Sequence, residues 1–242
     1  MYAIEVQDLV KIYEGGIKAL RGVSFNVIPG EIFGVIGPNG AGKTTLMRII
    51  ATLLKPTSGT VKVLGHDVVH EAEEVRKIIS YLPEEAGAYP NLTGLEYLTF
   101  MAKFYTNNEK ELQEMIRNAA RICNLGKRLY DRIKSYSKGM VRRLLVARTL
   151  MMKPKIALLD EPTSGLDVLH ALYIRNVIRN YAKKFGTTVL LSSHNMLEVD
   201  YLCDRVAIIN KGRIIAIGNP EELKEKYSAA NLEEVFAKAV RQ

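Results

Sequence analysis

The sequence has few cysteines, no long apolar run and no cluster of basic residues. Its two cysteines, Cys123 and Cys203, stand far apart and outside any metal-binding motif. This argues against a disulfide scaffold or a zinc site and fits a reducing compartment. The longest apolar runs fall short of a membrane-spanning helix. No secretory signal opens the chain, so we expect a cytoplasmic protein.

The net charge of +8 is not concentrated in one segment. A positive charge of this size is compatible with nucleic acid, an anionic membrane surface or a nucleotide as the partner. The basic residues occur in separated pairs, which are Arg142-Arg143, Lys183-Lys184 and Lys127-Arg128. Separated pairs are typical of solvated helix faces, so we expect no nucleic-acid partner.

The chain also lacks internal repeats and low-complexity linkers. Its 242 residues are enough for one α/β domain with a sizeable core and a smaller insertion. The hydrophobic fraction of 48% and the charged fraction of 25% are those of a soluble globular protein.

A glycine-rich loop between an apolar run and a helical pattern is the most informative feature. The loop consists of Gly37, Pro38, Asn39, Gly40, Ala41, Gly42, Lys43 and Thr44. In such a loop, backbone N–H groups turn toward the β-phosphate, Lys43 reaches the β and γ oxygens, and the Thr44 hydroxyl binds Mg²⁺. An ordinary glycine-rich turn is the alternative. The strand and helix context favours a site for a nucleoside triphosphate.

Hydrophobic patterns around this loop predict an α/β fold. Residues 2–8 and 19–28 alternate as antiparallel strands. The runs 156–159 and 206–209 have no polar alternation, which predicts strands buried on both faces inside a parallel sheet. Residues 91–153 repeat apolar side chains every three or four positions, which predicts a helical insertion.

The predicted fold class is therefore α/β, a P-loop NTPase core with a mixed, largely parallel sheet, an N-terminal antiparallel β subdomain and an inserted helical subdomain. We expect one domain, with a nucleotide-binding core at residues 1–90 and 154–220. Residues 91–153 form the helical insertion, and residues 221–242 form a short C-terminal helical tail.

Two adjacent carboxylates, Asp160 and Glu161, follow the apolar run 156–159. They would lie at the carboxyl edge of the sheet, where α/β sheets bind ligands. Asp160 can hold the hydrated Mg²⁺, and Glu161 can polarise the water that attacks the γ-phosphorus. Solvated acids at a strand end are the alternative. In the turn-rich segment that follows, Asp167 is expected to cap the next helix.

A single histidine, His194, follows the strand predicted at residues 187–191. A lone histidine in such a place is more often a structural residue. Its position on the edge that also carries Glu161 favours a second role, in which His194 donates a hydrogen bond to the γ-phosphate during cleavage.

With these motifs in this order, the chain resembles the ATP-binding cassette family, the nucleotide-hydrolysing subunits of ABC transporters. The resemblance covers nearly the whole sequence. It rests on the phosphate loop extended to Thr45, Glu84, residues 136–140, Asp160-Glu161, residues 164–167 and His194. It implies that Tyr13 stacks on adenine, although an ordinary loop tyrosine is the alternative. It also implies that Glu84 stands where a metal-binding glutamine is usual.

The resemblance further implies a head-to-tail dimer that buries ATP between the phosphate loop of one copy and the signature loop of the other. The partner's site residues would then be Ser137, Lys138, Gly139 and Asp167. The start of a helix predicted at 141–152 is suited to a γ-phosphate. Lys138 either pairs with the opposite γ-phosphate or points to solvent.

Two positions depart from the commonest pattern of the family. Glu84 replaces glutamine and can bind Mg²⁺ more strongly while adding negative charge near the phosphates. The signature reads Tyr-Ser-Lys-Gly-Met at 136–140 in place of Leu-Ser-Gly-Gly-Gln. Similar variants, and an ending like residues 231–236, occur in the branch that exports drugs, antibiotics, sodium ions or lipids.

The resemblance thus predicts an ATPase subunit that uses ATP and Mg²⁺, with Lys43, Glu161 and His194 as catalytic residues. It would lie on the inner face of the cell membrane through a separate permease attached near residues 84–93, most simply in an exporter. A soluble cassette acting on DNA, the ribosome or a protein assembly is the rival, although long coiled coils and a second cassette are absent. A nucleotide-sensing module without catalysis is a third possibility. The cargo and the identity of the second subunit are not encoded in these motifs.

Overall fold

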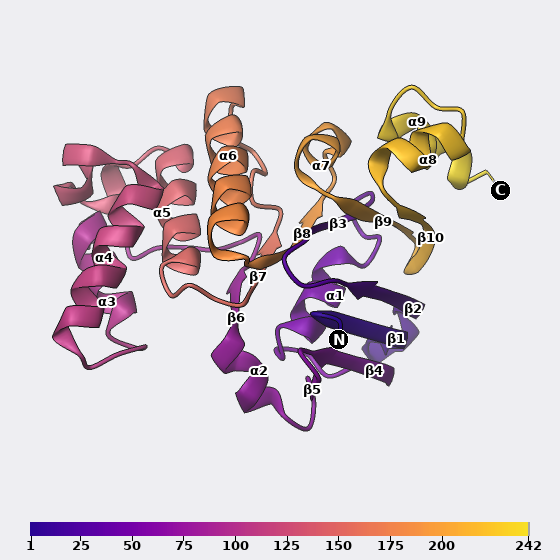
Figure 1. The fold of residues 1–242 in the computed structure, drawn as a ribbon, viewed down its shortest axis with the longest axis horizontal. Coiled ribbons are helices and arrows are strands. Elements are labelled where there is room, and N and C mark those ends of the chain that lie inside the picture. The colour runs from indigo at the N-terminus through magenta and orange to yellow at the C-terminus, as the bar shows by residue number, and fades with distance from the viewer. Residues whose placement is uncertain (242) are drawn as a thin grey trace.

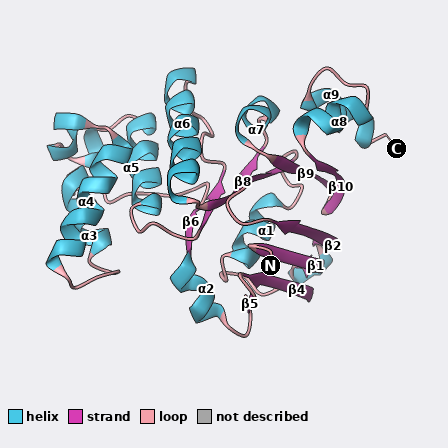
Figure 2. Ribbon diagram, in the orientation of Figure 1, coloured by secondary structure: helices cyan, strands magenta, loops and turns pink. Residues whose placement is uncertain are grey.

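The computed structural model describes residues 1–241, so only Gln242 of the predicted C-terminal tail lies outside it. Figures 1 and 2 show its helices and strands. The strands are β1 Ile4–Ile12, β2 Lys18–Val27, β3 Ile32–Ile36, β4 Ser58–Val63, β5 His66–Asp67, β6 Ile79–Leu82, β7 Ile156–Asp160, β8 Thr188–Ser193, β9 Arg205–Asn210 and β10 Arg213–Gly218. The helices are α1 Lys43–Ile50, α2 Ala72–Ile78, α3 Gly94–Ala102, α4 Glu109–Cys123, α5 Lys138–Leu150, α6 Val168–Phe185, α7 Met196–Leu202, α8 Pro220–Lys226 and α9 Leu232–Ala239.

A largely parallel sheet with the order β10-β9-β3-β8-β7-β6 forms the centre of the molecule. Only β10 runs antiparallel to its neighbour. Every residue of β3 and β7 is buried, as expected for apolar strands covered on both faces. Because β3, β7 and β8 are parallel, the phosphate loop, Glu161 and His194 leave the sheet at the same edge.

A second, antiparallel sheet has the order β2-β1-β4-β5 and alternates buried with exposed residues along much of β2. The two strands predicted at the N-terminus are present as β1 and β2. The two sheets meet where the backbone N–H of Arg21 donates to the Gly212 carbonyl over 2.8 Å. In Figure 1 this sheet lies beside α1, at the side of the molecule away from α3 and α4.

Helices α3, α4 and α5 gather at one end of the molecule (Figure 2). The stripe predicted for α4 faces the core, with Leu112, Ile116, Ala119 and Cys123 buried. The side chain of Asn108 accepts hydrogen bonds from the first turn of α4 and fixes its start. At α3, Thr93 and Glu96 form a reciprocal capping box. Within residues 1–241, no helix combines the length and apolar character needed to cross a membrane.

Three features differ from the sequence-based expectation. The signature helix α5 begins at Lys138, three residues earlier than predicted, because the Ser137 hydroxyl accepts from Met140 N and caps the first turn. The short helices α2 and α7 were not predicted. The pair Arg142-Arg143 is not a solvated face, since Arg142 is only 7% exposed. Burial of one residue of a basic pair depends on what packs against the helix, which local sequence does not reveal.

Candidate active site

The glycine-rich loop carries the chain from β3 into α1 and borders a cavity of ≈ 310 Å³. Gly42 has a φ of 107°, and a Cβ there would lie 2.6 Å from the Ala19 carbonyl oxygen. Only glycine fits both conditions without strain. The cavity is lined by Ala19, Asn39, Gly40, Gly42, Lys43, Thr44, Thr45, Glu84 and Glu161. A cavity bordered by a glycine-rich loop and a helix N-terminus is suited to phosphate groups.

Lys43 lines this cavity, and the residue is 5% exposed. Its ammonium group has three neighbours. It donates to the carbonyls of Gly37 and Pro38 over 2.8 and 3.3 Å. It also lies 3.3 Å from Oε1 of Glu161. The loop and the acidic end of β7 are therefore joined through one buried charge pair.

Glu161 is buried and presents its two oxygens to different partners. Oε2 lies 2.8 Å from Nδ1 of His194. Oε1 has the Lys43 ammonium nearby but accepts no hydrogen bond within residues 1–241. Glu161 has a φ of 49°, a left-handed conformation that is uncommon outside glycine. Oε1 is itself buried and therefore keeps a lone pair available for a hydrogen-bond donor.

Asp160 is fully buried beneath the loop. Its carboxylate accepts from the hydroxyl of Thr44 over 3.4 Å, from Tyr81 over 3.4 Å, and from Ser192. Burial, helped by the Asp160 charge, raises the pKa of Tyr81, so its hydroxyl stays a donor. Three hydroxyl groups therefore fix the orientation of this carboxylate.

These residues fit a magnesium ion that is bound mainly by phosphate and water. Mg²⁺ prefers oxygen ligands and keeps several waters, so one or two protein ligands suffice. Thr44 and Asp160 supply adjacent oxygens, and the Glu84 side chain lines the same cavity. Within residues 1–241, no group of three or more His, Cys, Asp or Glu side chains forms a metal cage by itself.

Tyr13 lies next to the phosphate loop. Its hydroxyl is 3.2 Å from the Thr45 hydroxyl. Its ring is 37% exposed and has the Lys11 ammonium 5.4 Å from its centre. An exposed ring beside the loop is available for stacking on a flat base.

The remaining predicted residues, Ser137, Lys138, Gly139 and Asp167, do not line the phosphate cavity. They form a separate signature surface at the starts of α5 and α6. Gly139 lies against the ring of His170, where any side chain would collide. The Asp167 carboxylate caps α6 by accepting from His170 N over 3.0 Å, as predicted. Lys138 lies against Gly165 of the same chain, so its side chain packs on the turn before α6.

Several residues that support the site were not predicted. Ser192 and Tyr81 hold Asp160, and Glu198 accepts from Thr163 and Ser193 over 2.6 and 2.9 Å. Ser192 lies two residues before His194, at the end of the predicted strand. The order of the strands could therefore have indicated that Ser192 lies near Asp160. Tyr81 sits on β6 and shows no motif of its own. Glu198 lies on α7, a helix whose short pattern gives little signal.

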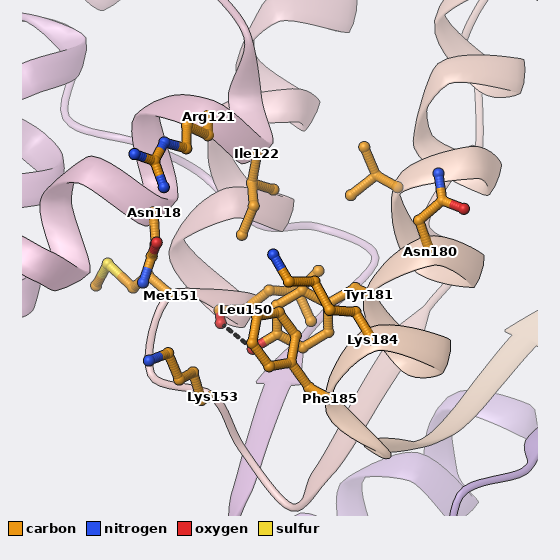
Figure 3. A pocket seen from close by; sticks show the side chains of 11 residues that line it. Asn118, Arg121, Ile122, Leu150, Met151, Lys153, Asn180, Tyr181, Lys184 and Phe185 are labelled. Carbon is orange, nitrogen blue, oxygen red and sulfur yellow. Dashed lines mark hydrogen bonds between the residues drawn. The ribbon is translucent and has the colours of Figure 1, made fainter.

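A second cavity of ≈ 240 Å³ lies among α4, α5 and α6, and Figure 3 shows its side chains. The Tyr181 hydroxyl donates to the Leu150 carbonyl over 2.7 Å beside it. It is lined by Asn118, Arg121, Ile122, Leu150, Met151, Lys153, Val177, Asn180, Tyr181, Lys184 and Phe185. None of these also lines the phosphate cavity, and none is a carboxylate. This cavity is therefore not part of the candidate active site.

Comparison with known proteins identifies a family. A family model described as ABC transporter matches residues 20–164. The chain is 40% identical to the daunorubicin/doxorubicin resistance ATP-binding protein DrrA of Streptomyces peucetius, over 92% of this chain and 67% of that protein. It is 38% identical to the ABC transporter ATP-binding protein NatA of Bacillus subtilis, over 97% of this chain and 94% of NatA.

Solved structures share the fold. An ATP-binding subunit of an ABC transporter superposes with a TM-score of 0.86 at 29% identity, covering 98% of this chain and 99% of that one. The cassette MJ0796, solved as a dimer in a post-hydrolysis state with ADP and Pi, gives a TM-score of 0.80 at 25% identity. That match covers 89% of this chain and 98% of MJ0796. These neighbours confirm the predicted α/β cassette fold.

Proposed function

Because this chain belongs to the ABC transporter family and is an ATP-hydrolysing, nucleotide-binding subunit of such a transporter, we propose that Glu161 is its catalytic base. Family membership confirms the resemblance recognised in the motifs and favours transport over a soluble cassette acting on DNA, the ribosome or an assembly. The family also indicates ATPase activity, which removes the reading of a nucleotide sensor without catalysis.

One observation carries this proposal: the buried Glu161 carboxylate has one oxygen paired with His194 and one without a hydrogen-bond donor. Glu161 lines the cavity that the phosphate loop borders, as does Lys43, whose ammonium lies 3.3 Å from this buried oxygen. A water between Glu161 and a γ-phosphate would pass a proton to this oxygen and bond to the γ-phosphorus, while the bond from the γ-phosphorus to the bridging oxygen breaks and ADP leaves with that oxygen. Lys43 then binds the phosphate oxygens, and His194 steadies the transferred phosphoryl group.

For the metal, we propose that Mg²⁺ is held by Thr44, with Asp160 orienting its water and Glu84 contributing a carboxylate. When bound, Mg²⁺ neutralises charge on the β and γ phosphates. The buried Asp160 is fixed by its hydroxyl donors. The exposed Glu84 belongs to the loop after β6 and lines the same cavity as Thr44.

The signature surface supports a site shared between two copies of the cassette. Ser137, Lys138, Gly139 and Asp167 lie apart from the phosphate cavity of their own chain. In a head-to-tail dimer they would close the cavity of the partner. The exposed side chains Val168 and Leu169, 78% and 77% exposed, adjoin this surface and supply apolar area for such a contact. The dimeric MJ0796 cassette is a precedent for two copies.

An aromatic surface next to the Glu84 loop supports attachment to a permease. It consists of Tyr89, Phe100, Phe104 and Tyr105, which are 43% to 68% exposed. Tyr89 packs edge-on against Phe100 at 5.7 Å, and Phe100 against Phe104 at 5.1 Å. An exposed aromatic cluster is typical of a binding site for a protein partner. We propose that a cytoplasmic segment of a permease covers it, placing the subunit on the inner face of the membrane.

Export is the proposed direction of transport, supported by relatives named for drug resistance. The attachment is tested by asking whether an ABC transporter permease co-purifies with the chain from detergent-solubilised membranes. Phe100→Ser with Phe104→Ser is expected to abolish capture without changing basal ATP turnover. Phe185→Ser, at an aromatic residue 42% exposed on α6, is the matched control. Undiminished capture by the double variant would contradict the attachment site.

The role of Glu161 is tested by steady-state ATP hydrolysis. Glu161→Gln removes the base but keeps the shape of the side chain, so turnover is expected to fall by about 100- to 10,000-fold. Glu225→Gln changes an exposed carboxylate on α8 and serves as the control. A Glu161→Gln variant that hydrolyses ATP at the wild-type rate would overturn the assignment.

A further inference from the structure

We propose that Arg142 is a positioning residue that orients Glu161 and connects it through hydrogen bonds to both the Glu84 loop and the signature helix. This inference rests on the catalytic role proposed for Glu161. Arg142 lies on α5, one turn beyond the signature surface. It does not line the phosphate cavity, so it is not placed as a ligand of the nucleotide. Its effect on hydrolysis is therefore indirect.

The guanidinium of Arg142 uses all of its hydrogen-bond donors on backbone carbonyls. Nε donates to Pro162 over 2.9 Å, and Nη2 donates to Asp160 over 2.9 Å and to Glu161 over 2.6 Å. Nη1 donates to Pro83 over 3.2 Å and to Glu84 over 3.1 Å. A guanidinium has five N–H donors in a rigid plane, so each one has a partner here.

These five carbonyls come from two segments that end neighbouring strands. Pro83 and Glu84 follow β6, while Asp160, Glu161 and Pro162 end and follow β7. Where neighbouring strands end, their carbonyls lose sheet partners and need other donors. Arg142 supplies these donors from a third element, α5. Lysine cannot reproduce the pattern, because an ammonium group has three donors and no planar fork.

Burial of the charged Arg142 guanidinium costs free energy. The side chain is 7% exposed, and burial lowers its pKa while the charges of Asp160, Glu84 and Glu161 act in the opposite direction. Burying a cation is unfavourable unless its donors are satisfied and opposite charges lie nearby. Both conditions are met at the active site, so the site and the buried arginine depend on each other.

The contact between Arg142 and the Glu161 carbonyl affects the orientation of the Glu161 side chain. With a φ of 49°, the Glu161 backbone is in a conformation that persists only when neighbours hold it. Its N–H donates to Ser192, and its carbonyl accepts the shortest of the Arg142 hydrogen bonds. Loss of the Arg142 contact would release this residue toward ordinary backbone angles and move the carboxylate away from His194.

The same guanidinium connects Glu161 with the Glu84 loop and with the signature helix α5. It holds the carbonyl of Glu84, whose side chain lines the phosphate cavity, and it is carried by the helix that begins at the signature surface. Movement of either part therefore changes the support of Glu161. The inference predicts that hydrolysis is impaired when this support is removed, while binding of the nucleotide is preserved.

The experiment compares adjacent arginines of α5. Arg142→Lys and Arg142→Gln are expected to lower kcat by about 100-fold, as displacements near 1 Å do, while the Kd for MgATP changes less than about threefold. Arg143→Lys and Arg143→Gln are the controls, since Arg143 donates instead to the Cys123 carbonyl and stacks on Tyr173. The controls are expected to keep the wild-type kcat.

Three results would overturn the inference. The first is a wild-type kcat in both Arg142 variants. The second is an Arg142→Lys variant in which the Kd for MgATP rises while kcat and the melting temperature fall, as for an ordinary structural residue. If neither variant folds, hydrogen exchange on the wild type decides: residues 83–85 and 160–163 should change protection together on adding Mg²⁺ and a non-hydrolysable ATP analogue. The third result that would overturn the inference is a change of protection in one of these two segments without a change in the other. Full turnover of Glu161→Gln would instead refute the proposed function.

Discussion

Nδ1 of His194 lies 2.8 Å from Oε2 of Glu161, while the Lys43 ammonium lies 3.3 Å from Oε1 of the same carboxylate. The two oxygens of one buried side chain therefore contact the first residue of α1 and the residue that follows β8. The arrangement fixes the Glu161 side chain without capping Oε1 by a hydrogen bond.

His194→Ala is expected to lower kcat by about 100- to 1,000-fold, because it removes a donor to the transferred phosphoryl group and one support of Glu161. The Kd for MgATP should change little, since the loop contacts persist. Rapid-quench measurement of ADP formation, with fluorescent-nucleotide titration for Kd, checks both values. His66→Ala, at a half-exposed histidine paired with Glu71, is the control. A normal rate in His194→Ala would remove this residue from the mechanism.

Lys43→Ala is expected to weaken binding of MgATP by about 10- to 100-fold, the value of one lost charge-assisted hydrogen bond. Hydrolysis should fall at least as much. Calorimetric titration measures the binding directly. Lys62→Ala, on the exposed side of β4, is the control and should bind normally. Equal affinity of Lys43→Ala and wild type would show that the loop does not hold phosphate.

Glu84→Gln restores the amide that is usual in the family. If the carboxylate is a metal ligand, its loss should raise the Mg²⁺ concentration for half-maximal ATPase activity several-fold. The maximal rate at saturating Mg²⁺ should be retained. Glu85→Gln changes the adjacent exposed acid and should leave the Mg²⁺ dependence unchanged. An unaltered Mg²⁺ curve for Glu84→Gln would exclude Glu84 as a ligand.

The buried Glu198 gives a prediction about stability and pH. Burial raises its pKa above the ordinary value of 4.5, against the opposing effect of the Thr163 and Ser193 hydroxyls and of Arg175. Above pH 4.5 the unfolded chain therefore loses this proton first, and the free energy of unfolding falls as pH rises through the folded-state pKa.

Glu198→Gln removes this titration while its amide can still contact both hydroxyls. The free energy of unfolding of the wild type should therefore decline relative to that of the variant, by at most about 1.4 kcal/mol per pH unit. Urea unfolding from pH 4 to 8 measures the difference. Two curves that run parallel over this range would contradict the buried-acid assignment.

Local motifs made much of the site predictable. The phosphate loop needs glycines that a short sequence displays, and an apolar strand ending in Asp160-Glu161 reveals its own place at the sheet edge. The strand order then brings His194 to the same edge. Even the cap formed by Asp167 follows from its neighbours in sequence. The surrounding fold followed from apolar runs whose burial the structure reproduces, as in β3 and β7.

Contacts between distant segments were not predictable in this way. Arg142 looks like half of a solvated pair until Pro83 and Glu161 are placed beside it. For Lys138 the sequence left open pairing with the opposite γ-phosphate or pointing to solvent, and its contact with Gly165 depends on how α5 and α6 pack. The left-handed backbone of Glu161 arises because Ser192 and Arg142 hold it, and no propensity of glutamate indicates it. Long-range packing, not local preference, decides these features.

We propose that ATP joins two copies of this cassette and that Glu161 is required to hydrolyse it. Size-exclusion chromatography with light scattering on Glu161→Gln, in saturating MgATP and in MgADP, tests both statements. The prediction is a dimer that retains uncleaved ATP in the first buffer and a monomer in the second. A monomer in both buffers, or ADP formed at the wild-type rate, would contradict it.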